Sequence, residues 1–390
     1  MLKKTKFQIS VPQEILDDLN ERLADTRWPI GYKGVDWEYG SDLNYLRELR
    51  DYWLRKYDWR KAETSLNQFN QYKTEVDGTE IHFIFEKGKG ANPKPIILTH
   101  GWPDSFYRFH KVIPMLTDPV RYGGGDPDET FDVIVPSIPG FGFSGKKAMS
   151  EEAVADLWVK LMNGLGYEQF FAAGGDMGSI ITKFMAFKYP ENVKGIHLTD
   201  VGYPDFMNMP QDLSEEEQKF VGFLGQWWMQ EGAFNMIQST KPQTLGYGLN
   251  DSPIGLAAWT TLLLGGKEPF GSRFDPDEQI TNLMIYWITE TINSSVKAYQ
   301  VGSQATSPIK PGQKVEVPTA VLHSTEDAPL PIDWAKRNVN LVQFNEIKAG
   351  HFAAWEKPDE YVNDVRSFVR TRNNNKAIGS DNPSYQTKEA

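Results

Sequence analysis

The sequence predicts an α/β fold built on a mostly parallel sheet, and two observations support this. Short apolar runs recur from about residue 80 onward, and helix-like segments such as 151–165 and 180–188 lie between several of them. Strands that alternate with helices in this way form parallel sheets that are covered on both faces. In addition, one apolar run ends in Gly-Gly-Asp-Met-Gly-Ser (174–179) directly before a helical pattern, which is the outline of a nucleophile elbow.

The expected elements can be assigned in chain order. Residues 1–90 are expected to be mainly helical, because apolar residues recur at helical spacing in a stretch that opens near Pro12 and in a second one at 43–54. The character changes near Glu80, and the expected strands are the short apolar runs at 81–86, 95–100, 131–136, 170–175, 195–200, 319–324 and 340–347.

The alternation of strands and helices stops between 203 and 299. This stretch is rich in aromatic residues and Met, and it has helix-like segments at 214–230, 253–264 and 276–298. We interpret it as a helical cap inserted over the sheet. The chain is therefore expected to divide into an N-terminal region (1–90), a first core part (91–202), the cap (203–299), a second core part (300–372) and a polar tail (373–390).

The composition excludes several classes of protein. The 390 residues carry a formal net charge of −11, so a basic face that binds nucleic acid is not expected. The absence of Cys excludes disulfides, thiolate metal sites and a Cys nucleophile. No window approaches the ~18 apolar residues of a membrane span. The early lysines have no apolar stretch behind them, which argues against a signal peptide and favours a cytoplasmic location.

Asp176 stands at the tip of the elbow, where a Ser is usual. A Ser that attacked a saturated carbon would form an ether with no easy exit. A carboxylate forms an ester instead, and water can hydrolyse that ester at the enzyme's own carboxyl carbon. Asp is ionised at neutral pH, because its ordinary pKa is about 3.9. The residue therefore points to a substrate with an electrophilic saturated carbon, such as an epoxide or an alkyl halide, and to chemistry without a cofactor or metal.

The other parts of such a site are expected after neighbouring strands. His351 follows the last expected strand and is the best candidate for the base that activates water. Glu326 and Asp327 follow the preceding strand, and their position alone does not separate them as the acid that orients the His. The backbone N–H groups of Trp102, in the turn after an earlier strand, and of Met177 would form an oxyanion hole.

The chain resembles the microsomal-type epoxide hydrolases of the α/β-hydrolase superfamily over about residues 5–372. The resemblance rests on motifs that follow in the family's order: FQISVPQEILDDLNERLADTRWP, HGWPDSFYRF, PSIPGFGFS, GGDMGS, QSTKPQTLGYGLNDSPIGLAAW, MIYW and KAGHFAAWE. It implies an α/β-hydrolase fold, with Asp176 as nucleophile and His351 as base. In this family the acid has a Pro five residues on and a Trp eight residues on, which favours Glu326. The wider superfamily often has Asp with a Pro four residues on, which makes Asp327 the alternative.

The resemblance also implies two lid tyrosines that hold and protonate the epoxide oxygen. Tyr299 matches the second, but the first position holds Phe234, which has no hydroxyl. Met177 stands where the family usually has Trp, and this removes an N–H that related dehalogenases use to hold halide. Three polar residues near the first position are candidates for the missing donor: Asn235, Gln238 and Tyr247.

Three functions stay open at this point. The sequence favours an epoxide hydrolase that converts a hydrophobic epoxide into a vicinal diol, with Trp102 and Phe234 beside the substrate. A haloalkane dehalogenase would use the same Asp, His and acid. A ligand-binding protein with a weakened site would explain Phe234. At the level of the family, an N-terminal region that wraps the core also implies a homodimer.

Overall fold

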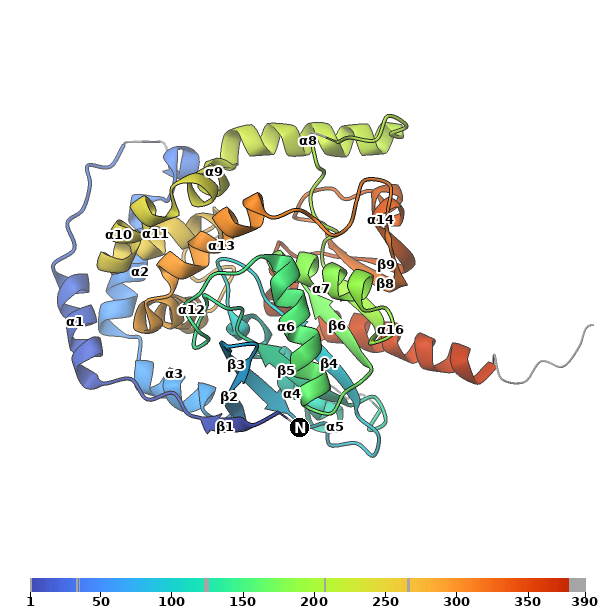
Figure 1. Cartoon of the computed structure of the whole chain (residues 1–390). Coiled ribbons are helices and arrows are strands. Elements are labelled where there is room, and N and C mark those ends of the chain that lie inside the picture. Colours follow the sequence, from blue (N-terminus) through green and yellow to red (C-terminus); the bar gives the residue numbers. More distant parts are fainter. Residues whose placement is uncertain are drawn as a thin grey trace, which may run out of the picture.

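A nine-stranded sheet forms the centre of the described part of the chain, which comprises residues 2–32, 34, 36–122, 126–206, 208–264 and 267–378 of this computed structural model (Figure 1). The strands are β1 (Lys4–Phe7), β2 (Gln71–Val76), β3 (Thr79–Glu86), β4 (Lys94–Thr99), β5 (Phe131–Pro136), β6 (Phe170–Gly174), β7 (Val193–Leu198), β8 (Val315–Ser324) and β9 (Val339–Ile347). Their order in the sheet is β1-β2-β3-β5-β4-β6-β7-β8-β9. The pairs β1–β2, β2–β3 and β3–β5 are antiparallel. The other five neighbouring pairs, from β5–β4 to β8–β9, are parallel.

The predicted α/β fold is confirmed, and the seven expected strands correspond to β3 through β9. Every residue of β5 and β6 is buried, as is usual in a parallel sheet covered on both faces. The expectation of a mainly helical N-terminal region is wrong in part, because β1 and β2 lie within it. The sequence of β1, KTKF, is almost wholly exposed at the edge of the sheet. An edge strand with charged side chains gives no apolar signal.

Helices cover both faces of the sheet (Figure 1). On one face α6 (Glu151–Gly164) packs with α7 (Met177–Lys188), and on the other α4 (Val112–Thr117) packs with α16 (Pro358–Ile378). Helix α16 continues into the expected polar tail, whose remainder, 379–390, lies outside the described residues. The shorter helical segments are η2 (Phe106–Phe109), α5 (Pro119–Tyr122), α14 (Ile332–Asn338) and α15 (Ala353–Glu356).

The segment between β7 and β8 forms a helical layer above the sheet (Figure 1). It contains α8 (Glu215–Glu231), α9 (Ala233–Thr240), α10 (Pro242–Asp251), α11 (Pro253–Leu264), α12 (Pro276–Thr289) and α13 (Ile292–Gln304). The single helix expected over 276–298 is two helices, because Glu290 takes up a left-handed conformation with φ 51° at the end of α12. We call these six helices the cap.

The N-terminal region packs against the cap and connects it to the core. It comprises β1, α1 (Gln13–Ala24), η1 (Asp36–Tyr39), α2 (Leu43–Arg55), α3 (Trp59–Leu66) and β2. Helices α1 and α2 pack against α11, and α3 packs against α12. The Tyr45 hydroxyl lies 3.0 Å from Gln279 Oε1, and the Tyr52 hydroxyl donates to Asp277 at 3.0 Å. The cap is therefore held from the side as well as by its two connections to the sheet.

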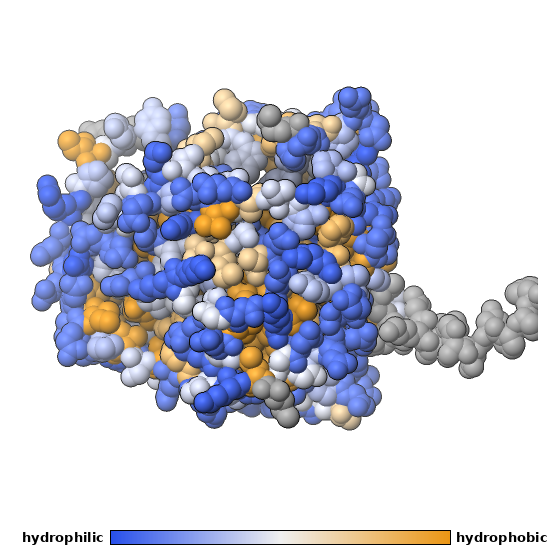
Figure 2. Space-filling view, viewed as in Figure 1, coloured by the Kyte–Doolittle hydropathy of each residue, from blue (hydrophilic) through white to orange (hydrophobic). Residues whose placement is uncertain are grey.

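The surface agrees with the acidic, polar composition. The face shown in Figure 2 is mostly hydrophilic, with apolar residues in small separate groups. Among the described residues, no helix has both the length and the apolar character that crossing a membrane requires.

Candidate active site

Asp176 lies at the sharp turn between β6 and α7. Its φ of 59° and ψ of −130° belong to a region that residues other than Gly rarely adopt. The turn also approaches β4 closely, since a Cβ added at Gly178 would lie 2.0 Å from the carbonyl oxygen of Thr99. A strained turn of this kind raises the carboxylate above the end of the sheet, as a nucleophile elbow does.

The side chains of Asp176, His351 and Asp327 form a continuous chain of hydrogen bonds. His351 Nε2 lies 3.2 Å from Asp176 Oδ2, and His351 Nδ1 lies 2.7 Å from Asp327 Oδ2. Burial opposes the charge on His351, but the two carboxylates outweigh it and raise the pKa of the imidazole well above its usual value. Burial likewise opposes the charge on Asp176, but His351 and two backbone N–H groups hold the pKa of this carboxyl below its ordinary value.

Asp327, and not Glu326, is the acid that contacts His351. Glu326 is 43% exposed at its side chain and faces Arg273, with 3.6 Å between Oε2 and Nη2. Family spacing favoured Glu326 for this position, whereas the structure places the alternative, Asp327, against His351. The reason is local geometry: adjacent residues of a turn point to different sides. Asp327 is fixed on the inner side, where its Oδ1 also accepts the N–H of Ala328 at 2.9 Å.

One of the two N–H groups expected to form an oxyanion hole already holds an oxygen of Asp176. The N–H of Trp102 donates to Oδ1 at 2.9 Å, and the N–H of Met177 helps to lower the pKa of the same carboxyl. With Oδ2 turned toward His351, Oδ1 would remain as the carbonyl oxygen of any ester formed through Oδ2. The N–H of Trp102 therefore stands where negative charge would develop when water attacks that ester.

A buried ion pair that the sequence analysis missed supports the loop of Trp102. Arg108 Nε lies 2.7 Å from Asp104 Oδ2, and the two side chains are 3% and 0% exposed. Asp104 accepts the N–H of Gly101 at 3.0 Å, while Arg108 donates to the carbonyl oxygen of His351 at 3.2 Å. Burial raises the pKa of Asp104 to about 6, although Arg108 opposes the shift. The ion pair therefore connects the loop of Trp102 with the loop of His351. The sequence signal that could have indicated this ion pair was the presence of two opposite charges four residues apart in HGWPDSFYRF.

Asp200 is a second carboxylate that the sequence analysis did not single out. It follows β7, and its Oδ2 accepts the backbone N–H of Asp176 and the hydroxyl of Ser179, each at 2.9 Å. Burial raises the pKa of Asp200, while the positive charge of His351 opposes the shift. The side chain therefore anchors the backbone of the strained elbow.

The carboxylate of Asp176 opens into a cavity of about 240 Å³ beneath the cap, which His351 and Tyr299 also line. Apolar side chains of the elbow helix and of α8 and α9 contribute much of the remaining wall. Its apolar members are Met177, Ile180, Trp227, Trp228 and Phe234, and its polar members are Glu151, Asp200, Tyr203, Asn235, Ser239 and Ser303.

Phe234 and Tyr299 lie together in the cavity, as a pair of lid residues would. Their ring centroids are 6.2 Å apart, and they lie 6.1 Å and 5.8 Å from the ring of Trp102. Trp102 is only 1% exposed and packs behind the pair, so it is not part of the cavity wall. Burial and the charge of Asp176 raise the pKa of Tyr299 well above its usual value, which keeps its hydroxyl protonated.

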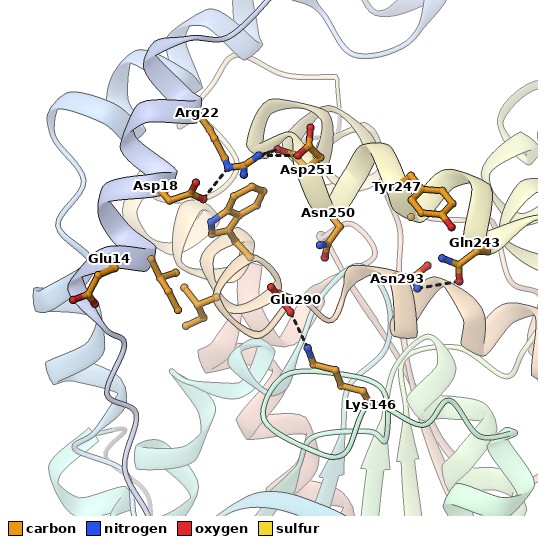
Figure 3. A pocket seen from close by; sticks show the side chains of 14 residues that line it. Glu14, Asp18, Arg22, Lys146, Gln243, Tyr247, Asn250, Asp251, Glu290 and Asn293 are labelled. Atoms are coloured by element: carbon orange, nitrogen blue, oxygen red, sulfur yellow. Dashed lines mark hydrogen bonds and ion pairs between the residues drawn. The ribbon is translucent and has the colours of Figure 1, made fainter.

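Of the three polar candidates for the missing hydroxyl, Asn235 alone lines the cavity. Gln238 is buried, and its Oε1 accepts the indole N–H of Trp259 at 2.8 Å. Tyr247 is 73% exposed and lines a different crevice, between α1 and α10, whose other side chains include Arg22 and Asn293 (Figure 3).

Gly101→Ala is expected to reduce activity by about 100-fold or more. The new Cβ would lie 2.2 Å from Asp176 Oδ1, so the carboxylate would have to leave the N–H of Trp102. A displacement of about 1 Å at a reacting group is enough for a loss of this size. Single-turnover kinetics with the full-length chain measures the effect. Gly222→Ala is the matched control, because a Cβ at that position meets nothing within 4 Å. Equal rates for the two variants would contradict the assignment.

Comparisons with known proteins agree with this geometry. Residues 4–109 match the family model described as epoxide hydrolase N terminus, and residues 94–252 match the one described as alpha/beta hydrolase fold. Epoxide hydrolase 1 of Sus scrofa is 35% identical over 399 residues, which cover 93% of this chain and 88% of that protein. The crystal structure of juvenile hormone epoxide hydrolase from the silkworm Bombyx mori has a TM-score of 0.85 at 28% identity and covers 96% of each chain. The structure of Aspergillus niger epoxide hydrolase has a TM-score of 0.82 at 28% identity and covers 95% of this chain and 97% of that one.

Proposed function

We propose that this chain, which belongs to the epoxide hydrolase family, hydrolyses a compact hydrophobic epoxide to a vicinal diol through an ester on Asp176. One observation carries the proposal. Asp176 has one oxygen bound by the N–H of Trp102 and the other beside His351, at the floor of an apolar cavity. That arrangement suits a carboxylate that attacks through one oxygen and is regenerated by water.

In the first step, Oδ2 of Asp176 attacks a ring carbon of the epoxide. A new C–O bond forms to the enzyme, and the bond between that carbon and the ring oxygen breaks. The released oxygen takes up a proton from the Tyr299 hydroxyl. That hydroxyl lines the same cavity and is kept protonated by its raised pKa.

In the second step, His351 takes a proton from a water molecule, which attacks the carboxyl carbon of the ester. The charge that develops on Oδ1 is stabilised by the N–H groups of Trp102 and Met177. Collapse of this intermediate releases the diol, whose departing oxygen takes its proton from His351. The second proton of the water, left on the carboxyl group of Asp176, returns to the phenolate of Tyr299 and restores the free enzyme. Asp327 holds the imidazole in the required orientation throughout.

Formation of the ester also prepares His351 for the second step. In the free enzyme, Asp327 and Asp176 together outweigh burial and favour the imidazolium, so the ring is protonated below its raised pKa. Esterification removes the charge of Asp176. The pKa of the imidazole should then fall, which allows the ring to lose its proton and act as a base.

Asp176→Asn, a neutral mimic of the ester, is therefore expected to lower the pKa of His351. An NMR titration of the imidazole resonances measures it, and six His residues make assignment by substitution practical. Asp18→Asn is the control, because Asp18 lies on the exposed face of α1. An unchanged pKa in Asp176→Asn would show that the nucleophile does not govern the protonation of the base.

The cavity indicates the size of the substrate. Its volume of about 240 Å³ is below the roughly 300–1,000 Å³ typical of ligand pockets. Three aromatic residues of the cap, Trp227, Trp228 and Phe234, form part of its wall. An epoxide with a single aromatic ring or a short alkyl chain fits these limits better than a long-chain or polycyclic one.

Turnover of a panel of aryl and alkyl epoxides of graded size, with a haloalkane included, tests this function. We expect diol formation from the smaller epoxides and none with the Asp176→Asn variant. Release of halide without any diol would assign the chain to the dehalogenases. Binding of epoxides without turnover would favour a ligand-binding protein.

A further inference from the structure

The turn that follows β7 brings a second tyrosine to the cavity of Asp176. Tyr203 lies five residues after Leu198, the last residue of β7, and lines the same cavity as Asp176, Tyr299 and His351. It lies outside the two positions at which the family resemblance implies lid tyrosines. The inference that follows rests on the proposed function, because it concerns how the epoxide oxygen is held.

This turn is attached directly to the nucleophile elbow. Asp200 accepts the N–H of Asp176 through Oδ2, and through Oδ1 it accepts the N–H of Gly202 at 3.0 Å. Lys183, on the elbow helix, donates to the carbonyl oxygen of Val201 at 2.5 Å. Gly202 has a φ of 80°, a left-handed conformation that redirects the chain immediately before Tyr203. The backbone just before Tyr203 is therefore held relative to Asp176 by contacts within the core.

The ring of Tyr203 joins the aromatic wall beside the lid pair. Its centroid lies 5.5 Å from that of Trp228 in an edge-on contact, and Trp228 in turn stacks on Phe234 at 6.3 Å. The residue as a whole is 49% exposed, which places it at the edge of the cavity. Burial at the site and the charges of Asp327, Asp200 and Asp176 raise the pKa of Tyr203 well above its usual value. The phenol therefore stays protonated in the cavity that Asp176 and His351 also line.

The two phenols line the same cavity. The pKa of Tyr299 is raised mainly by burial and by Asp176, and Tyr203 contributes to the same shift. Two neutral phenols in the cavity of one nucleophile are groups that could each donate a hydrogen bond to an epoxide oxygen. Phe234 takes the position of a lid residue but supplies only its ring.

We propose that Tyr203 supplies the hydroxyl that Phe234 lacks, so that Tyr203 and Tyr299 together donate hydrogen bonds to the epoxide oxygen. As Asp176 forms its bond to the ring carbon, the bond to the ring oxygen breaks, and that oxygen takes one proton from the pair while the other hydroxyl stays hydrogen-bonded to it. The proton returns to the phenolate when the ester is hydrolysed. One donor thus comes from the cap and the other from the sheet.

Glu151 is the main competitor for this role. It lines the cavity, and burial raises the pKa of its carboxyl. Its carboxylate, however, lies against α13 at Gly302, where a Cβ would meet Oε1 at 2.7 Å. Glu151 therefore has a structural position at the start of α6, whereas no hydrogen bond is found for the Tyr203 hydroxyl among the described residues.

The test compares Tyr203→Phe with the double variant Tyr203→Phe/Phe234→Tyr. Rapid quench and intact-mass measurement, made with a compact aryl epoxide, give the rates of ester formation and ester hydrolysis separately. We expect Tyr203→Phe to slow ester formation by about 10- to 100-fold and to leave ester hydrolysis within about 2-fold, because the hydroxyl acts only on ring opening. The double variant should recover most of the lost rate, since it moves the hydroxyl to the usual lid position. Tyr247→Phe, in the crevice of Figure 3, should form the ester at the wild-type rate.

Three results would overturn the assignment. Ester formation in Tyr203→Phe at the wild-type rate would show that its hydroxyl is not used. A loss confined to Glu151→Gln would transfer the role to that carboxyl. Equal slowing of both steps, without recovery in the double variant, would mean that Tyr203 is only structural. A wild-type chain that forms no ester with any epoxide would overturn the proposed function itself. This outcome differs from the three results above, because each of them is measured against an active wild type.

Discussion

His351→Gln is expected to stop the reaction after a single step and leave the substrate attached to Asp176. Without the imidazole no group takes a proton from the attacking water, whereas the nucleophile and the N–H group of Trp102 remain in place. Steady-state turnover should fall by roughly 10⁴- to 10⁶-fold, the range found when members of Ser-His-Asp triads are removed. Intact mass should rise by the mass of the epoxide, and peptide mapping should locate the gain on Asp176.

Two controls define this result. His351→Gln combined with Asp176→Asn should give no adduct, because the nucleophile is then absent. His110→Gln controls for the loss of an imidazole elsewhere in the protein and should accumulate no ester. His110 stacks on Tyr107 and contacts Glu278, away from the cavity. An adduct on any residue other than Asp176 would contradict the assigned nucleophile.

Asp327→Asn is expected to reduce turnover by roughly 10⁴-fold, the loss seen when the acid of a Ser-His-Asp triad becomes its amide. The amide cannot stabilise the imidazolium and favours the wrong tautomer of His351, whose Nδ1 now lies 2.7 Å from the carboxylate. Ester hydrolysis should suffer most, and the ester should accumulate as in His351→Gln.

Glu326→Gln is the matched control for Asp327→Asn, because the two acids are neighbours in one turn. Glu326 is partly exposed and contacts Arg273, so its loss should change turnover by less than about 3-fold. Exposed ion pairs of this kind contribute little to stability. If Glu326→Gln lost activity and Asp327→Asn kept it, the hydrogen-bonded chain of Asp176, His351 and Asp327 would not be the catalytic one.

The fold could be predicted wherever burial left a clear pattern. The seven apolar runs became β3 to β9, and the signal is clearest for β5 and β6, because strands covered on both faces carry buried side chains along their whole length. The edge strand β1 was not predicted, because its exposed lysines give no pattern of buried apolar residues. The break between α12 and α13 was also missed, because it depends on the conformation of Glu290 and not on hydrophobicity.

The candidate site could be predicted from order along the chain, but not in its side-chain directions. Asp176 and His351 were identified because their places after particular strands are constrained by the topology. The choice between Glu326 and Asp327 depends on which side of one turn each side chain faces, and spacing to later residues does not encode that. Tyr203 gave no signal at all, because it lies in an irregular turn whose path is set by Asp200 and Gly202.

The most direct test of the ester on Asp176 is a single turnover in water enriched in ¹⁸O, with enzyme in excess over epoxide. In the proposed reaction the diol leaves with an oxygen that came from Asp176, and the water oxygen stays on the carboxylate. We predict an unlabelled diol and a mass gain of one ¹⁸O in the peptide that contains Asp176. A labelled diol and an unlabelled peptide would mean that water attacks the epoxide directly, and the covalent mechanism would then be wrong.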